Sequence, residues 1–402
     1  MSFSMLFLVL AIAMVAIHLG VVAGALASVV REPGRGRTRY GAARPSVDVL
    51  VPARDEEALL PRLLERLREQ DTDRFNVILV NDRSADATPL IMEEFRAALP
   101  GRVTIVTLID DPPHGNPKQR ALASGSEHST ADVILMTDAD CLPHRSWVRT
   151  MSAAFGDPEV GLAFGSVIPH TEGLERAMRP LDRFQSFDQT FRFQYTAGAA
   201  GLGAPSGGYG NNMAVRREAL DAAGGFAGLR YSPTEDAQLI AQVRETGAWK
   251  IRAIRGPGAH VAPAPEATFR ELIEQSIRWN TGGLFAPDRT TRVSYGIVML
   301  YLFASVLIAP LGLLYAPLAL PALGSFTSMV ILGLLAGALN RREPLYWLLL
   351  VPNVLVAMLF YTYVTILTLA RVPVSWKGQK LSGKTGEGSG GDEQDGDRPA
   401  RH

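Results

Sequence analysis

The chain has almost no cysteine and no excess of charge of either sign. Its 402 residues include one cysteine, Cys141, and 40 basic against 40 acidic side chains. One cysteine cannot form an intramolecular disulfide or a cysteine-based zinc site, so disulfide scaffolds and zinc fingers are excluded. Zero net charge removes the basic footprint that nucleic-acid-binding proteins usually show. A P-loop enzyme is disfavoured because no Gly-x-x-x-x-Gly-Lys-Ser/Thr run follows any expected strand.

Polar residues are scarce near the N-terminus. Between residues 5 and 30 the only polar interruptions are His18 and Ser28, and about 20 apolar residues suffice to cross a bilayer as a helix. A cleavable signal peptide is the alternative, but no basic residue precedes the apolar run, which is also longer than a typical signal core. We therefore expect a retained transmembrane anchor over residues 1–31. The arginines that follow, at positions 31, 35, 37 and 39, predict that the next region is cytoplasmic.

The C-terminal region is apolar again, in segments of about 295–314, 318–339 and 346–369. Each is long enough to span a membrane and lacks the polar face of a soluble helix, so we expect a transmembrane region over residues 293–371. Basic residues favour a cytoplasmic position both for Arg341 and Arg342 and for the stretch around Lys377. Three full crossings cannot satisfy both assignments. Either one segment is re-entrant or interfacial, or one boundary is misread. Residues 378–402 lack apolar periodicity and are expected to be a disordered tail.

Residues 46–290 read as an α/β domain. Short runs rich in β-branched residues predict strands over 47–51, 76–80, 103–108 and 132–137, and helical patterns lie between them over 55–69, 84–98 and 117–127. Alternating strands and helices predict a doubly wound, mostly parallel sheet. Ligands of such sheets bind at the carboxyl ends of the strands.

Acidic residues follow three of these strands. Asp138 and Asp140 end the fourth strand, where two carboxylates suit Mg²⁺ or Mn²⁺ bound together with substrate phosphates. Helix capping by Asp55 and Ser84 explains part of the polar sequence after the first two strands. Three acidic strand ends on one edge exceed what capping needs and suit a nucleoside. Lys118 lies near a helix start, where a phosphate binds well, although a solvated surface lysine explains it equally.

Seven motifs in this order resemble those of membrane-bound family 2 glycosyltransferases with a GT-A catalytic domain. The match covers residues 46–283, and members similar to ceramide glucosyltransferases and carotenoid glycosyltransferases share the layout. The motifs are residues 52–57, Asn81-Asp82-Arg83-Ser84, Lys118 with Ala121-Leu122, Asp138-Ala139-Asp140, residues 210–214, Thr234-Glu235-Asp236 and Gln275-Ser276-Ile277-Arg278-Trp279.

The resemblance implies a role for each site residue. Asp82 would contact the nucleoside, Asp138 and Asp140 would hold Mg²⁺ or Mn²⁺ on the diphosphate, and Asp236 would be the general base of an inverting transfer. First-turn helix capping is the structural alternative for Asp236. The residues expected to bind the donor are Pro52, Glu56, Asp82, Lys118, Asp138, Gln275, Arg278 and Trp279.

Gln275, Arg278 and Trp279 are expected on one face of a helix that begins near Thr268. The resemblance assigns Arg278 to the diphosphate and Trp279 to the acceptor or sugar, with core packing as the alternative for Trp279. His260 and Glu266 lie in a connecting segment similar to that of the family. They are left out of the catalytic set because a lone histidine is more often structural.

The leading hypothesis is an inverting glycosyltransferase of the cell membrane that moves a sugar from a nucleotide sugar, expected to be UDP-linked, to a lipid hydroxyl at the cytoplasmic face. A processive polysaccharide synthase of the same family is the alternative, but it needs a transmembrane channel, and only about three segments follow the catalytic domain. A non-catalytic membrane-binding protein on the same fold is the third reading. It is disfavoured because the acids Asp82, Asp138, Asp140 and Asp236 are all present.

Overall fold

The computed structural model describes residues 3–30, 45–110, 116–170, 177–340, 342–373, 375–376 and 379–380. The arginines at 31–39 and most of the expected tail therefore lie outside the described residues. Residues 379–380 of that tail form a short strand, β11 (Gln379–Lys380), paired with β10 (Ser375–Trp376).

A seven-stranded sheet forms the centre of the middle domain, with the strand order β3-β2-β1-β4-β7-β6-β8. β1 pairs in parallel with β2 and β4, and β2 with β3, whereas β7 is antiparallel to both neighbours. The prediction of a doubly wound, mostly parallel sheet is confirmed. The strands are β1 (Val47–Ala53), β2 (Asn76–Asp82), β3 (Val103–Leu108), β4 (Val133–Met136), β6 (Val160–Phe164), β7 (Met213–Arg216) and β8 (Lys250–Ala253).

Apolar side chains cover both faces of this sheet. Along β1, Val49 and Val51 belong to one buried cluster and Leu50 to another, because successive side chains of a strand point to opposite faces. The covering helices are α2 (Leu60–Arg68), α3 (Thr88–Ala98), α4 (Pro117–Ser126), α5 (Trp147–Ala153), α6 (Pro180–Gly201), α7 (Arg217–Ala222) and α8 (Glu235–Glu245). Helix α9 (Phe269–Leu284) belongs to a separate buried cluster through Leu272, Ile277 and Leu284. A small antiparallel pair, β5 (Cys141–Pro143) and β9 (Val261–Pro263), completes the domain.

Two helices begin later than the sequence predicts. α2 starts at Leu60 and α3 at Thr88, so helical starts at 55 and 84 were wrong. Asp55 has a φ of 53°, in the left-handed region that does not continue into a helix. Its backbone N–H donates to Ser84 Oγ at 3.1 Å, and its Oδ1 accepts from the N–H of Ala85 at 2.8 Å. Asp55 and Ser84 therefore join the loops after β1 and β2 to each other instead of capping the helices.

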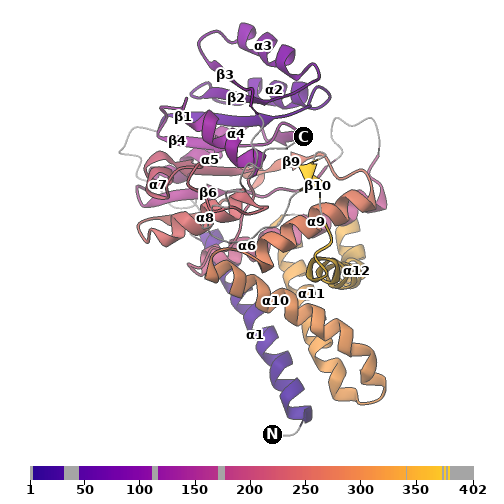
Figure 1. The fold of residues 1–402 in the computed structure, drawn as a ribbon. Helices are drawn as coiled ribbons and strands as arrows, with labels where there is room; N and C mark the ends of the chain where they lie inside the picture. The colour runs from indigo at the N-terminus through magenta and orange to yellow at the C-terminus, as the bar shows by residue number, and fades with distance from the viewer. Residues whose placement is uncertain are drawn as a thin grey trace, which may run out of the picture.

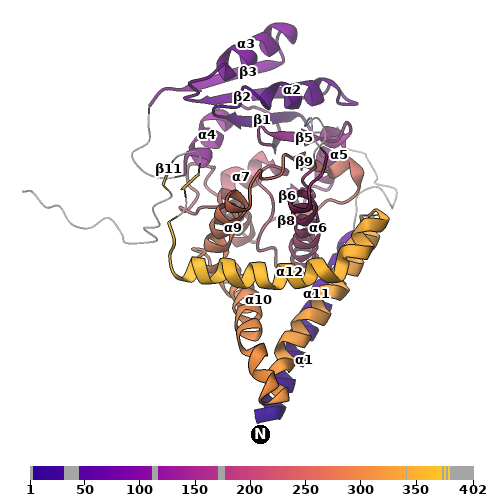
Figure 2. The ribbon, with the colours of Figure 1, turned by 90° about the vertical axis from the view of Figure 1, so that its right-hand side faces the viewer.

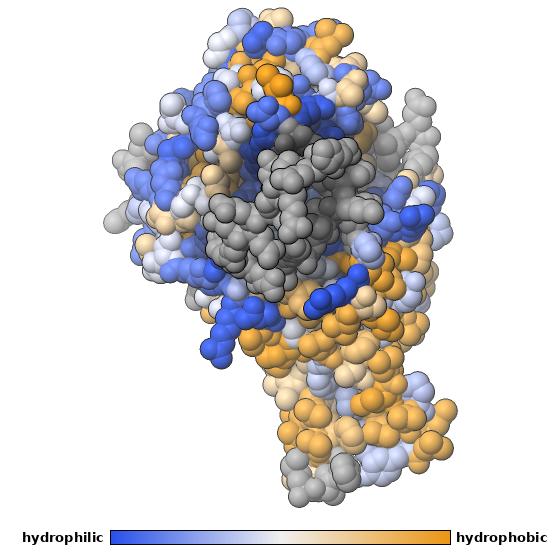
Figure 3. Space-filling model, in the orientation of Figure 1, coloured by the Kyte–Doolittle hydropathy of each residue, from blue (hydrophilic) through white to orange (hydrophobic). Residues whose placement is uncertain are grey.

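Four helices are long and apolar enough to cross a membrane: α1 (Phe3–Val30), α10 (Arg289–Ile308), α11 (Leu320–Leu339) and α12 (Pro344–Leu369). Figure 1 shows α1, α10 and α11 extending from the same side of the middle domain. In the space-filling view, hydrophobic residues cover these helices and hydrophilic ones dominate the domain above them (Figure 3). At the far end, Ser4 on α1 hydrogen-bonds to Tyr315, between α10 and α11.

α12 lies across α10 and α11, beneath the middle domain, and is seen nearly end-on in Figure 1 and lengthwise in Figure 2. Near its start, the Tyr346 ring lies 5.7 Å from the Phe187 ring of α6. Near its end, Thr368 Oγ1 accepts from Asn280 Nδ2 of α9 at 3.0 Å. Both ends of α12 thus contact the middle domain.

α1 packs closely against α6 through glycines. A Cβ added to Gly24 of α1 would lie 2.2 Å from the carbonyl oxygen of Gly198 on α6, and one added to Gly201 would lie 1.9 Å from the carbonyl oxygen of Gly24. Small residues at such crossings let two backbones approach. The first apolar helix is therefore packed directly against α6 of the middle domain.

Candidate active site

One large cavity of about 1050 Å³ extends from the carboxyl ends of β1, β2 and β4 to the apolar helices. The structure brings together in its wall every residue that the sequence predicts for the site: Pro52, Glu56, Asp82, Lys118, Asp138, Asp140, Asp236, Gln275, Arg278 and Trp279. They come from six separate segments of the chain, which meet because parallel strands end on one edge.

The carboxylate pair after β4 faces a lysine. Lys118 Nζ lies 2.6 Å from Asp138 Oδ1 and 3.2 Å from Glu235 Oε1. Asn116 caps α4 by accepting from the N–H groups of residues 118 and 119, and its Nδ2 donates to Glu235 Oε2 at 3.2 Å. Burial alone would lower the pKa of Lys118, but the two carboxylates outweigh burial and raise it. Lys118 is thus a charged, internal side chain, and the solvated surface alternative is wrong.

A divalent cation fits this pair only with help from the substrate. Asp138 and Asp140 both line the cavity, but among the described residues no group of three or more His, Cys, Asp or Glu side chains is arranged to hold a metal. Mg²⁺ commonly binds through one or two carboxylates and completes its shell with waters and phosphate oxygens. The residues present suit a cation that arrives with a diphosphate.

Asp236 lies in the first turn of α8. Its Oδ2 accepts from the backbone N–H of Gly210 at 2.9 Å, and its Oδ1 from the N–H of Ala237 at 2.8 Å. Gly210 is needed for this approach, because a Cβ there would lie 3.0 Å from Glu235 Oε1 and 3.2 Å from Asp236 Cβ. The Ala237 contact is a local helix-start bond, as the capping alternative expects, yet the carboxylate still faces the cavity.

The neighbouring acids Glu235 and Asp236 have opposite pKa shifts. Burial, followed by the negative charge of Glu235, raises the pKa of Asp236 to about 6. Burial would also raise the pKa of Glu235, but Lys118 outweighs burial and lowers it. When two neighbouring acids have pKa values shifted in opposite directions, they commonly have different acid and base roles in catalysis. Asp236 is the one placed near neutrality, where a general base works best.

Asp82 ends β2 as a buried carboxylate. Its Oδ1 accepts from Arg83 Nε at 2.8 Å, and Arg83 has a φ of 59°. Such strained backbone is typical of functional sites. Pro52 and Glu56 lie beside it, on β1 and in the loop after β1, so these three predicted donor-binding residues share one end of the cavity.

Helix α9 begins after Thr268, whose side chain accepts from the N–H of Glu271, as expected. Gln275, Arg278 and Trp279 all face the cavity. Gln275 Nε2 donates to Glu266 Oε1 at 2.5 Å, so Glu266, left out at first, belongs to the cavity wall. The Trp279 ring lies 5.2 Å from the guanidinium carbon of Arg192, in the geometry of a cation–π contact, rather than in an apolar core.

The sequence reasoning missed helix α6. Asp188, Gln189, Arg192 and Tyr195 line the cavity, and Arg192 Nε donates to Asp188 Oδ2 at 2.8 Å. Polar residues at positions i, i+4 and i+7 on one helix face are the signal that was available. It was overlooked because α6 carries none of the family's motifs.

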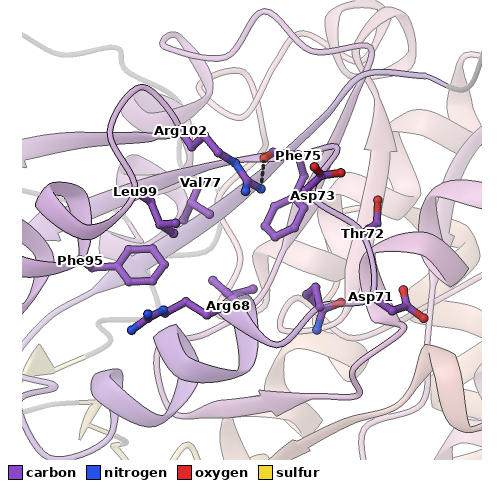
Figure 4. Close-up of a pocket in the computed structure, with 11 residues that line it drawn as sticks. Arg68, Asp71, Thr72, Asp73, Phe75, Val77, Phe95, Leu99 and Arg102 are labelled. Atoms are coloured by element: carbon purple, nitrogen blue, oxygen red, sulfur yellow. Dashed lines mark hydrogen bonds between the residues drawn. The ribbon is translucent and has the colours of Figure 1, made fainter.

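A second cavity of about 490 Å³ lies at the opposite edge of the sheet. Figure 4 shows Phe75, Phe95 and Arg102 in its wall, with Arg102 donating to the Phe75 carbonyl oxygen. None of the predicted site residues reaches it. Because it lies at the amino ends of β2 and β3, it is not where an open α/β sheet binds its ligand.

Two curated relatives match part of the chain. "Probable glycosyltransferase YdaM" of Bacillus subtilis is 29% identical over 254 residues, which are 60% of this chain and 56% of the relative. A beta-monoglucosyldiacylglycerol synthase of Synechocystis is 27% identical over 241 residues, 60% of this chain and 48% of the relative. The chain therefore spans about half the length of these two proteins.

A solved structure shares the fold. The mannosyltransferase PcManGT from Pyrobaculum calidifontis, solved in complex with GDP-Man and Mn²⁺, superposes with a TM-score of 0.56 and 19% identity, covering 91% of this chain and 99% of that one. This likeness confirms the GT-A fold. The model of the family described as glycosyl transferase family 21 matches residues 5–388, which confirms the recognition of a glycosyltransferase: the chain belongs to glycosyl transferase family 21.

Proposed function

We propose that this glycosyltransferase moves a sugar from a nucleotide sugar to the hydroxyl of a membrane lipid, with inversion at the anomeric carbon, at the cytoplasmic face of the membrane. One observation carries the proposal. A single cavity joins the carboxylates at the strand ends to the interior of the apolar helices, so a lipid in the membrane and a donor in the catalytic domain share one space.

The wall of the cavity changes character along its length. Its membrane end is lined by Met14 and Ile17 of α1, Ile297 and Leu302 of α10, and Met329 of α11. Apolar walls suit acyl or isoprenoid chains, because burying their CH₂ groups is favourable by about 0.8 kcal/mol each. A growing polysaccharide instead needs hydrogen-bonding groups along its path. The lining therefore favours a lipid acceptor over a processive synthase.

At the other end, the donor would bind as a nucleoside diphosphate sugar. The Asp82 carboxylate can accept a hydrogen bond from a ribose hydroxyl or a nucleobase N–H. The planar guanidinium group of Arg278 can donate to two diphosphate oxygens. Asp138 and Asp140 would hold Mg²⁺ or Mn²⁺, which when bound stabilises negative charge on the departing diphosphate. The Mn²⁺ and GDP-Man of PcManGT support this assignment in general terms. A UDP-sugar is the donor that we propose to test first.

Asp236 would remove the proton of the acceptor hydroxyl. Its carboxylate is fixed by two backbone N–H groups, and its raised pKa makes it a better base than an exposed aspartate. Base and diphosphate on opposite sides of the sugar give attack from the face opposite the leaving group, and hence inversion. The name of the Synechocystis relative, a beta-monoglucosyldiacylglycerol synthase, supports a lipid acceptor.

The orientation in the membrane follows from α12. If α1, α10 and α11 cross and α12 lies along the cytoplasmic interface, then Arg342 and the end of α12, which the basic stretch around Lys377 follows in the sequence, lie on the same side as the catalytic domain. Arg342 Nη2 donates to Ser186 Oγ of α6 at 2.7 Å, which supports that placement. Three crossings after the catalytic domain cannot satisfy both basic sequence signals, at Arg342 and around Lys377. With only α10 and α11 crossing, both signals are compatible with the cytoplasmic side.

The deciding experiment incubates membranes that contain the protein with a panel of radiolabelled nucleotide sugars, followed by lipid extraction. We expect label in the lipid fraction from one donor, and none with the Asp236→Asn variant. Label in high-molecular-weight polymer would favour the processive synthase instead. No incorporation from any donor, with nucleotide-sugar binding retained, would favour a binding protein.

A further inference from the structure

The first apolar helix brings one titratable side chain into the cavity. His18 is buried on α1 and lines the cavity with Met14, Ile17 and Val21. Between residues 3 and 30 it is the single side chain that can ionise. Polar groups at such positions are costly in a membrane and usually functional. Membrane anchoring alone does not require a histidine, so we expect a separate function for His18.

The hydrogen bonds of His18 fix its form. Its Nδ1 lies 2.9 Å from the carbonyl oxygen of Met14, and a carbonyl oxygen only accepts, so Nδ1 carries the proton. Its Nε2 lies in a short hydrogen bond with Tyr195 Oη of α6. In the neutral ring that nitrogen accepts, and the Tyr195 hydroxyl donates to it. The hydroxyl oxygen of Tyr195 then keeps its lone pairs for another partner.

Tyr195 continues a polar row on α6 that starts near the catalytic groups. Asp188, Arg192 and Tyr195 follow one another at positions i, i+4 and i+7, over about 10 Å of helix. The Arg192 guanidinium carbon lies 5.2 Å from the Trp279 ring centre and 4.9 Å from that of Tyr361. The row therefore runs from the motif residue Trp279 of α9 to His18 in the first apolar helix.

This row carries no uncompensated charge. Arg192 is the one cation among the residues of α1, α6, α10, α11 and α12 that are known to line the cavity. It is paired with Asp188 at 2.8 Å, and Tyr361 donates a short hydrogen bond to the other oxygen of that carboxylate. An ionised phosphate beside this row would face the acceptor oxygens of Asp188 and Tyr195 and an arginine whose charge Asp188 already balances. An O–H or N–H group of a ligand would instead find a hydrogen-bond acceptor in the Tyr195 hydroxyl.

We propose that the His18–Tyr195 pair binds the polar group of the acceptor lipid, with Tyr195 Oη accepting a hydrogen bond from a hydroxyl or amide of that group, and that it selects neutral lipids over lipid phosphates. This inference rests on the proposed lipid glycosyltransferase function. It makes α1 a wall of the acceptor site, positioned through the contact of Gly24 with Gly198. His18 and Tyr195 are binding and positioning residues, and the chemistry stays with the catalytic domain.

The test compares Tyr195→Phe and His18→Gln with the wild type in detergent micelles. Tyr195→Phe keeps the ring and removes the hydroxyl, whereas the glutamine amide retains one donor and one acceptor. Leu19→Ala is the matched control, because Leu19 lies on the same helix with 51% of its surface exposed and does not line the cavity. The acceptors are diacylglycerol, a short-chain ceramide and a polyprenyl phosphate, each assayed at saturating donor.

We expect Tyr195→Phe to raise KM for the preferred neutral acceptor about tenfold, the usual effect of leaving a buried hydrogen-bonding group without its partner. KM for the nucleotide sugar and kcat should stay within about twofold of the wild type, His18→Gln should lie between the two, and Leu19→Ala should match the wild type. A purely structural role would lower kcat and weaken donor binding together.

Two results would overturn the inference while leaving the proposed function standing: an unchanged acceptor KM in Tyr195→Phe, or equal losses of donor and acceptor binding. A wild type that prefers the polyprenyl phosphate, whose acceptor atom is a phosphate oxygen, would overturn the inference together with the proposed hydroxyl acceptor. A wild type that labels polymer and no lipid would instead refute the proposed function itself. The two failures are therefore distinguishable in one set of assays.

Discussion

The replacement Asp236→Asn tests the proposed chemistry most directly. Asparagine keeps the size of the side chain and one acceptor oxygen, so it can still accept from either Gly210 or Ala237, but its amide nitrogen cannot take a proton from the acceptor hydroxyl. The donor would be held elsewhere, by Asp82, the metal site and Arg278. Nucleotide-sugar binding measured by calorimetry should therefore survive the replacement.

The magnitude follows from the role of the carboxylate. General-base assistance contributes about 10² to 10⁴ in rate, equivalent to about 3 to 5 kcal/mol of transition-state stabilisation. The loss of one of the two backbone hydrogen bonds of Asp236 adds about 1 kcal/mol of lost stability, too little to unfold the domain. Turnover should fall at least 100-fold while the protein remains folded and binds donor.

The pH profile gives an independent reading of the same residue. The active base is the deprotonated carboxylate, and burial with the Glu235 charge raises the Asp236 pKa to about 6. The value of kcat/KM for the acceptor should therefore fall about tenfold per pH unit below about pH 6. Glu235→Gln removes a negative neighbour and should move this acidic limb to lower pH. Asp236→Asn should have a low rate that shows no such fall below about pH 6.

Two outcomes would refute the reasoning. Loss of donor binding in Asp236→Asn, with the maximal rate retained at saturating donor, would make Asp236 a donor ligand and leave the base to be sought among acids such as Glu235 or Glu266. An acidic limb that does not move in Glu235→Gln would separate the observed titration from Asp236.

The other predictions concern the metal, the diphosphate, the membrane and the helix contact. Asp140→Ala should abolish transfer and remove the Mg²⁺ or Mn²⁺ dependence of donor binding, and unchanged turnover in a chelator would contradict this. Arg278→Ala should raise the Kd of the product nucleoside diphosphate as well as lower turnover, because it removes a charge-assisted contact. A cysteine at Leu314, which is 88% exposed, should react with an impermeant probe on intact cells, and a cysteine at Val372 should not; labelling of both would mean that α12 crosses. Native Cys141 is buried and gives little background. Gly24→Leu should lower the thermal unfolding temperature, because its Cβ would lie 2.2 Å from the Gly198 carbonyl oxygen, whereas a leucine at the open position Gly20 should have little effect.

The sheet was predictable from local sequence, and the starts of α2 and α3 were not. Strand runs such as residues 76–80 carry their own signal, because a strand buried on both faces is continuously apolar. Asp55 and Ser84 looked like helix caps because those residue types cap helices. Their actual partners lie about 30 residues away in the sequence, across two loops, and no local pattern contains that information.

Part of the candidate site was likewise predictable from local sequence, and part was not. Acids at strand ends can be read from the chain, because the direction of each strand fixes where its last residue lies. The polar row of α6 has a helical signature, but its meaning depends on α1 and α12, whose His18 and Tyr361 come from opposite ends of the chain. Lys118 was placed near its helix start correctly, yet its pairing with Asp138 and Glu235 needed the folded arrangement.

Helix α6 links the membrane and the chemistry in one element. It packs against α1 through Gly198, hydrogen-bonds to α12 through Asp188, and stacks Arg192 on Trp279 of α9. A displacement of α1 would therefore move a wall of the acceptor cavity, and the Tyr195 hydroxyl would lose its histidine partner. The apolar helices do more than hold the enzyme at a surface: under the proposed function, the geometry that they impose on α6 sets how deeply a lipid enters and which of its atoms reaches Asp236.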